Sequence, residues 1–146
     1  MIHLPWYIAA LGAALVWGLH YPLIAHALKH VSIPSVLVLS VLPLFVLAPF
    51  FYRPVVADLH AVMDLSWGAR ALILAISLTS LTGTVFMYLA IGGKNATLAA
   101  MIEISYPAFV ALFAWLLFRE VQISPSVLAG GALVFAGVTI IILGNR

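Results

Sequence analysis

Charge and cysteine are what this sequence lacks most. Only 7% of its 146 residues are charged, whereas a soluble domain has about a quarter; 66% are hydrophobic and the mean hydropathy is +1.25. So few charges cannot cover a water-facing surface, which indicates an integral membrane protein. The absence of cysteine excludes disulfides, thiolate metal sites and cysteine nucleophiles. The net charge of +2 is too small and too scattered to indicate nucleic-acid binding.

Long apolar stretches take the place of charge. A membrane-spanning helix needs about 20 mostly apolar residues. Five stretches qualify, at roughly 5–27, 34–52, 67–91, 95–118 and 125–144. We therefore expect an all-α membrane protein in which five transmembrane helices form a bundle and a single domain over residues 1–146. The linker "RPVVADLHAVMDLSW" contains both aspartates and is expected to lie along the membrane interface as a short helix.

Capping residues agree with these boundaries. Ser124 before Pro125 predicts the start of the last helix, and Asn95 is placed to cap the fourth. The pair Gly92-Gly93 is expected to end the third helix.

The basic residues give no preferred orientation in the membrane. With five spans the two ends of the chain lie on opposite sides, and six basic residues divide equally between them. Arg53, Arg70 and Arg119 fall on the N-terminal side; Lys29, Lys94 and Arg146 fall on the other. Such a tie removes the positive-inside bias. We expect insertion in both orientations and pairing as an antiparallel homodimer; the alternative is an accidental tie in a small protein with few charges.

One acidic side chain lies in the middle of the fourth stretch, within "MIEISYP" (101–107). Glu103 is roughly 12 Å along the helix axis from the start of that span, near the membrane midplane. Charged side chains at this depth cost about 2.5–3.5 kcal/mol to insert and face a bundle interior or a wet cavity. Pro107 lacks the N–H that would bond the Glu103 carbonyl, so we expect a kink and a binding site at an interrupted helix. The alternative is a structural glutamate, protonated and bonded to Tyr106 or to a neighbouring helix.

The first stretch contains a similar interruption in "VWGLHYP" (16–22). Trp17, His20 and Tyr21 can share one side near the middle of the membrane, and Pro22 frees the carbonyl of Gly18. We expect Trp17 to line a pocket. His20 either relays protons and contacts the substrate or donates one hydrogen bond between helices, and both interpretations are open.

Two further sets of residues, each on one side of a helix, indicate helix packing rather than a role in catalysis or proton transfer. The hydroxyls of the third stretch share one side of a helix, and among them Tyr88 is the candidate for lining a pocket. Gly130, Gly137 and Gly144 recur every seven residues and predict a smooth seam for helix packing or dimerisation.

No set of residues has the spacing of a metal or cofactor site. The weak pair His26 and His30 lies at a helix end beside Lys29, and we interpret it as a solvated end rather than a metal site. The sequence has no protease or nucleotide-binding motif. We therefore expect no cofactor and no enzymatic activity; an intramembrane hydrolase would need a second carboxylate or a nucleophile with its base.

Two segments of this chain resemble a known family. "AALVWGLHYPLIAHAL" is similar to the start of the EamA-type domain of the drug/metabolite transporter superfamily, and residues 85–144 are similar to its closing half. Most relatives resemble a tandem of two inverted five-helix repeats. This chain matches one repeat, so the resemblance implies a half-size prokaryotic member in which two copies meet.

The resemblance also assigns individual positions. Trp17, Gly18, Pro107, Glu120 and the glycines of the last stretch match family positions, with Glu120 in a structural role at the surface. Many relatives have glutamate directly before the central proline, where this chain has Tyr106. The small multidrug members have their coupling glutamate in the first helix, where this chain has His20 nearby. These departures leave both the substrate and the coupling ion open.

Together these features predict a transporter of small organic solutes in the inner membrane of a prokaryote. It would work by alternating access between two inverted copies, with proton coupling through Glu103. Trp17, Tyr88 and Tyr106 would shape the pocket, near Tyr21 and His20. One alternative is a flippase for lipid-linked or amphiphilic cargo. Another is a partner subunit without transport activity that packs on a paralogue through its last helix.

Overall fold

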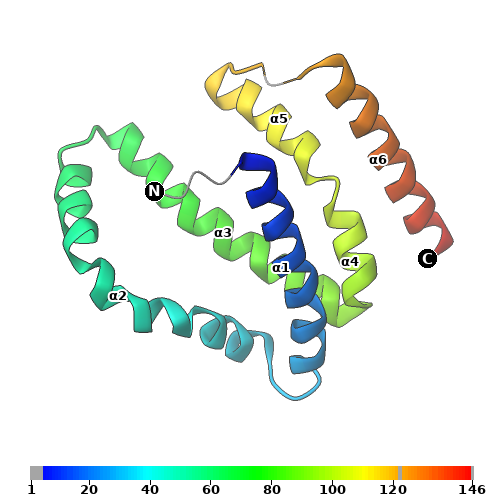
Figure 1. Cartoon of the computed structure of the whole chain (residues 1–146), viewed down its shortest axis with the longest axis horizontal. Helices are drawn as coiled ribbons and strands as arrows, with labels where there is room; N and C mark the ends of the chain where they lie inside the picture. Colours follow the sequence, from blue (N-terminus) through cyan, green and yellow to red (C-terminus); the bar gives the residue numbers. More distant parts are fainter. Residues whose placement is uncertain (1–4, 122, 146) are drawn as a thin grey trace. The chain divides into compact units, whose positions relative to one another are not determined.

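The described residues, 5–121 and 123–145, form six helices in a computed structural model (Figure 1). The helices are α1 Trp6–Ala27, α2 Ile33–Met63, α3 Trp67–Gly93, α4 Ala96–Glu103, α5 Tyr106–Phe118 and α6 Pro125–Gly144. They supply five spans that are long and apolar enough to cross a membrane, because α4 and α5 together make one span. The predicted all-α class with five apolar spans is confirmed over these ranges. Arg146, one of the six basic residues counted for orientation, lies outside the described residues.

Contacts divide the chain into two units. The first unit consists of Met1–Pro22 and Gly93–Arg146, and therefore includes most of α1 with α4, α5 and α6. The second unit, Leu23–Gly92, includes the end of α1, all of α2 and nearly all of α3.

The predicted fourth helix is interrupted within the membrane span. α4 ends at Glu103 and α5 begins at Tyr106, so Ile104 and Ser105 separate two helices. Pro107 explains the position of the break, because its ring would clash with the carbonyl of residue 103 in a continuous helix. Near the start of α5 the same proline fits well. The Ser105 hydroxyl donates to the carbonyl of Ile102 at 2.9 Å, which satisfies one carbonyl at the end of α4.

Side-chain caps begin α4 and α6. The Asn95 side chain accepts a hydrogen bond from the Leu98 N–H at 2.9 Å, and Ser124 accepts one from the Val127 N–H at 3.3 Å. Both predicted caps are confirmed. Each satisfies one of the donors that a helix start leaves without an intrahelical partner.

The second helix is longer than the sequence predicted. α2 continues to Met63 instead of ending near residue 52, and its 31 residues include Pro34 in the first turn and three prolines inside the helix. The residues expected to form a separate interfacial helix are therefore the last part of α2. The charge on Arg53 ends the apolar run but does not interrupt the backbone hydrogen bonds. Figure 1 shows that α2 is bent along its length, as internal prolines favour.

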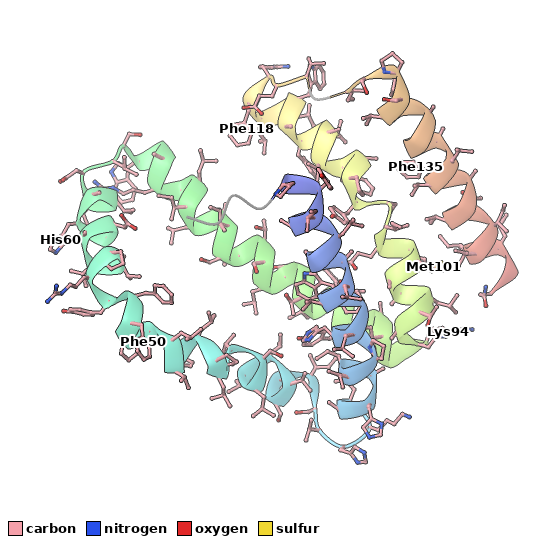
Figure 2. All side chains as sticks on the ribbon, in the orientation of Figure 1. Phe50, His60, Lys94, Met101, Phe118 and Phe135 are labelled. Carbon is pink, nitrogen blue, oxygen red and sulfur yellow. The ribbon has the colours of Figure 1, made fainter. Side chains whose placement is uncertain are left out.

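Few side chains are buried, and those of the first unit lie where α4 packs on α6. α4 and α6 contact each other, and Ala96, Ala99 and Val138 are the buried apolar residues of this unit. Lys94, labelled in Figure 2, donates from Nζ to the Asn145 carbonyl at 3.3 Å, so the start of α4 lies beside the end of α6. The two helices therefore run antiparallel. Most other large apolar side chains are exposed and available to lipid or to another chain.

Candidate functional site

The acidic side chain at the break in the span is hydrogen-bonded to the first helix. The Tyr21 hydroxyl donates to Glu103 Oε2 at 2.6 Å, and the contact is partly buried. A distance in this range is typical of a hydroxyl that donates to a carboxylate. Tyr21 and Glu103 are 82 positions apart in the sequence, and both belong to the first unit. The structure thus brings together two of the predicted site residues at the end of α4.

Among residues 5–121 and 123–145, the second oxygen of this carboxylate has no hydrogen-bond partner. Within the described part of the chain, the bond from Tyr21 is the only hydrogen bond to Glu103, and no basic side chain forms an ion pair with it. The described lysine and arginine of the first unit are engaged elsewhere. Lys94 bonds the Asn145 carbonyl, and the Arg119 guanidinium lies 5.4 Å from the centre of the Trp115 ring. Within the described part of the chain, the carboxylate therefore has one oxygen available and no counter-charge.

Three aromatic side chains of α1 form a cluster that includes Tyr21. The Trp17 ring lies 5.2 Å from the His20 ring, edge to face, and 5.6 Å from the Tyr21 ring between centroids. Spacings of three and four residues place side chains on the same face of a helix, which explains the cluster. Trp17 is 53% exposed, whereas His20 and Tyr21 are partly buried. We refer to Trp17, His20 and Tyr21 as the aromatic cluster.

The other tyrosines proposed for the pocket lie in different surroundings. Tyr106 is the first residue of α5 and is 59% exposed. Tyr88 belongs to the second unit, where it is 2% exposed and its hydroxyl lies 3.2 Å from that of Ser40. Because the Ser40 hydroxyl donates to the Val36 carbonyl at 2.8 Å, Tyr88 is the donor in this pair. The roles of Tyr88 and Tyr106 in a pocket stay predictions.

An apolar cleft of about 560 Å³ lies between α5 and α6. Ile104, Ser105 and Pro107 line it beside the break, and Ala108 and Ala111 continue along α5. On α6 the lining includes Gly130, Gly131 and Phe135. Phe135, labelled in Figure 2, packs edge to face on Phe109 with 6.5 Å between ring centroids. The sequence did not predict this cleft, although the alanines on α5 and the paired glycines on α6 are the signal for it.

The glycine seam of α6 is open along its length. A Cβ atom added at Gly130, Gly137 or Gly144 would have no neighbour within 4 Å among the described atoms outside the local helix. The seam is therefore not used for packing within the described chain. It remains available to a helix from another molecule.

The histidine pair at the end of α1 has no third metal ligand among the residues that the structure describes. The rings of His26 and His30 lie 5.3 Å apart between centroids. Over the described ranges, no group of three or more histidine, aspartate or glutamate side chains is arranged to hold a metal ion.

Comparison with known protein families places this chain in one of them. The model of the EamA-like transporter family matches residues 4–143, which cover the five spans except for Gly144 at the end of the last one. The family resemblance found in the sequence motifs is thereby confirmed. No curated protein and no solved structure matches the chain.

Proposed function

Because the chain belongs to the EamA-like transporter family, a family of membrane transporters, we propose that it moves small organic solutes across a membrane by alternating access. The interruption of the fourth span at Glu103 is the observation that supports this function best. Transporters commonly build midplane sites from interrupted helices, and an acidic side chain inside a membrane marks such a pathway by default. The bond from Tyr21 ties the first helix to this point.

Proton exchange at Glu103 is the proposed source of energy for transport. A carboxylate with one available oxygen and no counter-charge among the described residues can accept a proton or a substrate group, and it can exchange one for the other. Solute would then bind this oxygen while the site is open to one side of the membrane. A proton would bind the same oxygen while the site is open to the other side.

Two copies of the chain, inserted in opposite orientations, would complete the pathway in the inner membrane of a prokaryote. The match covers one five-helix repeat, and the open glycine seam supplies a surface for a second chain. The equal division of basic residues is compatible with either orientation. The proposed active form is thus an antiparallel homodimer.

Glu103→Gln tests proton coupling. Purified protein in liposomes should drive solute uptake or release that depends on a pH gradient, with solutes chosen by thermal-shift screening between about pH 5 and 8, because a ligand stabilises the folded state by mass action. We expect Glu103→Gln to fold and to lose pH-dependent flux, since glutamine has nearly the same shape but cannot carry the proton. Asp58→Asn, an acidic change near the end of α2, is the matched control and should retain it. Undiminished proton-coupled flux in Glu103→Gln would refute the coupling role.

The absence of cysteine makes orientation easy to measure. Ser66→Cys places a single thiol between α2 and α3, in a chain with no cysteine background. An impermeant maleimide applied to intact spheroplasts should label about half of the thiols if the chain inserts both ways, because the K/R balance gives no bias. Labelling of all or none would contradict dual insertion.

The apolar cleft supports a second candidate, the movement of amphiphilic cargo. It is large, lies beside the break in the span and exposes mainly carbon atoms to the surroundings. An acyl chain fits such a surface. Ala111→Phe would fill the cleft, and loss of labelled-lipid flipping in proteoliposomes, with solute transport unchanged, would favour this function. Absence of flipping by the unmodified protein would exclude it.

A further inference from the structure

The cleft between α5 and α6 extends through one half of a membrane. Its lining starts at Ile123, before α6, and continues along that helix to Phe135, which is labelled in Figure 2. On the other side it reaches Ile104, beside the break in the span. From Pro125 to Phe135 the helix rises about 15 Å. Because a hydrocarbon core is about 30 Å thick, the cleft has the depth of a single leaflet.

The cleft is narrower than a helix of another molecule. Over this depth, its volume of about 560 Å³ gives a mean cross-section of about 37 Å². A helix that is about 10 Å across with its side chains needs about 79 Å², roughly twice that area. A hydrocarbon chain is thinner than a helix, and among the described lining residues Ser105 alone has a polar side chain. The acyl chain of a lipid therefore fits this space.

A basic side chain lies at the membrane-surface end of the cleft. Arg119 directly follows the last residue of α5, in the same loop as Ile123. Its exposed guanidinium lies 5.4 Å from the centre of the Trp115 ring, and among the described residues it forms no ion pair. Arginine and tryptophan are typical of the level at which lipid headgroups lie. A guanidinium there can bind a phosphate group with two parallel hydrogen bonds.

The backbone at Arg119 is one that favours glycine. Its φ of 58° lies in the left-handed region, where a Cβ atom is crowded by the following carbonyl. Glycine is the usual residue at this position after a helix. Residues held in such a conformation are concentrated at functional sites. The side chain of Arg119 thus occupies a position where glycine would be more stable, which indicates a role for its charge.

We propose that the cleft between α5 and α6 holds one acyl chain of a resident anionic phospholipid, and that Arg119 binds the phosphate group of this lipid. All of the residues involved belong to the first unit. The lipid stays bound as part of the folded protein, so the site is separate from solute transport and does not include Glu103. It also differs from an amphiphilic cargo, which would leave the cleft in each transport cycle.

Lipids with the same acyl chains and different headgroups test the charge preference. Phosphatidylglycerol is anionic, phosphatidylcholine has a phosphate but no net charge, and diacylglycerol has no phosphate. Native mass spectrometry of the detergent-purified full chain counts the lipids bound at each concentration. We expect phosphatidylglycerol to bind about fivefold more tightly than phosphatidylcholine, the factor that one basic residue contributes at an anionic surface, and diacylglycerol to bind most weakly. Equal binding of all three, or no bound lipid, would overturn the proposal.

Arg119→Gly separates lipid binding from folding. It should make the chain more resistant to unfolding in SDS, since glycine suits this backbone, and should reduce the preference for phosphatidylglycerol about fivefold. Arg119→Lys should retain most of that preference, because the charge remains. Arg53→Gln is the matched control, since it removes an equal charge from the second unit, and it should bind as the unmodified protein does. A preference that survives in Arg119→Gly would overturn the proposal.

Gly131→Leu locates the acyl chain. Gly131 lines the cleft, and a Cβ atom there would have no neighbour within 4 Å among the described atoms outside the local helix, so the variant should fold. Leucine would occupy part of the cleft and should weaken binding of all three lipids by at least about tenfold, because each buried methylene contributes to binding. Gly12→Leu on α1 has equally open surroundings and should bind normally. Unaltered lipid binding together with lost crosslinking between copies of Gly131→Leu would assign the cleft to dimer formation and overturn the proposal.

Two further measurements separate a resident lipid from transport. Glu103→Gln should bind phosphatidylglycerol as the unmodified protein does, whether or not solute flux is lost; loss of lipid binding in this variant with an intact fold would contradict a separate site. Labelled phosphatidylglycerol should not cross the membrane of proteoliposomes. Flipping that is lost in Gly131→Leu would identify this lipid as cargo and would overturn its assignment as resident.

Discussion

The hydrogen bond between Tyr21 and Glu103 should stabilise the folded chain measurably. Hydrogen bonds to charged groups contribute about 1.5–3 kcal/mol in proteins, whereas interhelical hydrogen bonds in a membrane protein average about 0.6 and reach about 1.7 kcal/mol. The length of 2.6 Å favours the upper end, and partial burial lowers the contribution. We therefore expect Tyr21→Phe to lower the free energy of unfolding by about 1–1.5 kcal/mol, within the measured range for membrane proteins.

A double-mutant cycle measures this interaction without counting other losses. Unfolding of the unmodified protein, Tyr21→Phe, Glu103→Leu and the double variant can be followed in SDS titrations, and the coupling free energy is the part that is not additive. A second cycle with Tyr88→Phe and Ser40→Ala supplies the internal comparison. That pair is uncharged and 3.2 Å apart, so its coupling should be only about 0.5 kcal/mol.

The comparison of the two cycles decides the outcome. A Tyr21–Glu103 coupling larger than that of Tyr88–Ser40 is expected, because a carboxylate is the stronger acceptor. A coupling of zero, or one below that of the uncharged pair, would refute the assignment of Tyr21 as the residue that holds Glu103.

Three further predictions follow from the helix ends and the glycine seam. Asn95→Ala should lower the unfolding free energy by about 1 kcal/mol, and Ser124→Ala should lower it less, because its cap bond is 3.3 Å rather than 2.9 Å; equal losses in SDS titration would contradict this ranking. Pro107→Ala should extend the helix across the break and slow transport, as far-UV circular dichroism and liposome flux would show; an unchanged flux would contradict a role for the break. Gly137→Ala should stabilise the chain by up to about 1 kcal/mol and weaken dimer formation measured by crosslinking. The control Gly12→Ala on α1 should leave the dimer unchanged. Equal crosslinking of both variants would contradict a role for the seam.

The helical class and the number of spans could be predicted because apolar run length alone determines them. The residues Asn95 and Ser124 also predicted their helix starts correctly, since capping depends on local hydrogen bonds. The end of α2 was placed too early because Arg53 was taken as the limit of the helix. Backbone hydrogen bonding, which continues past a charged residue, decides where a helix ends.

The candidate site could be predicted only in part. Glu103 and Tyr21 were both identified from their depth in apolar stretches, and a neighbouring helix was one of the partners considered for Glu103. Their pairing could not be read from periodicity, because the two residues are 82 positions apart and belong to different helices. The cleft between α5 and α6 was missed for a similar reason: it depends on how the two helices are placed, which small residues permit but do not specify.

The length of α2 has a consequence for the membranes in which this protein can work. Its 31 residues extend about 46 Å, whereas a hydrocarbon core is about 30 Å thick. The stretch from Ile33 to Arg53 alone covers about 30 Å. In a thicker bilayer, a longer part of α2 can therefore lie within the hydrocarbon core. In a thinner bilayer, a shorter part can lie there, or the helix can tilt. Hydrophobic mismatch at α2 is thus adjustable, whereas α6, with 20 residues, fits one thickness closely.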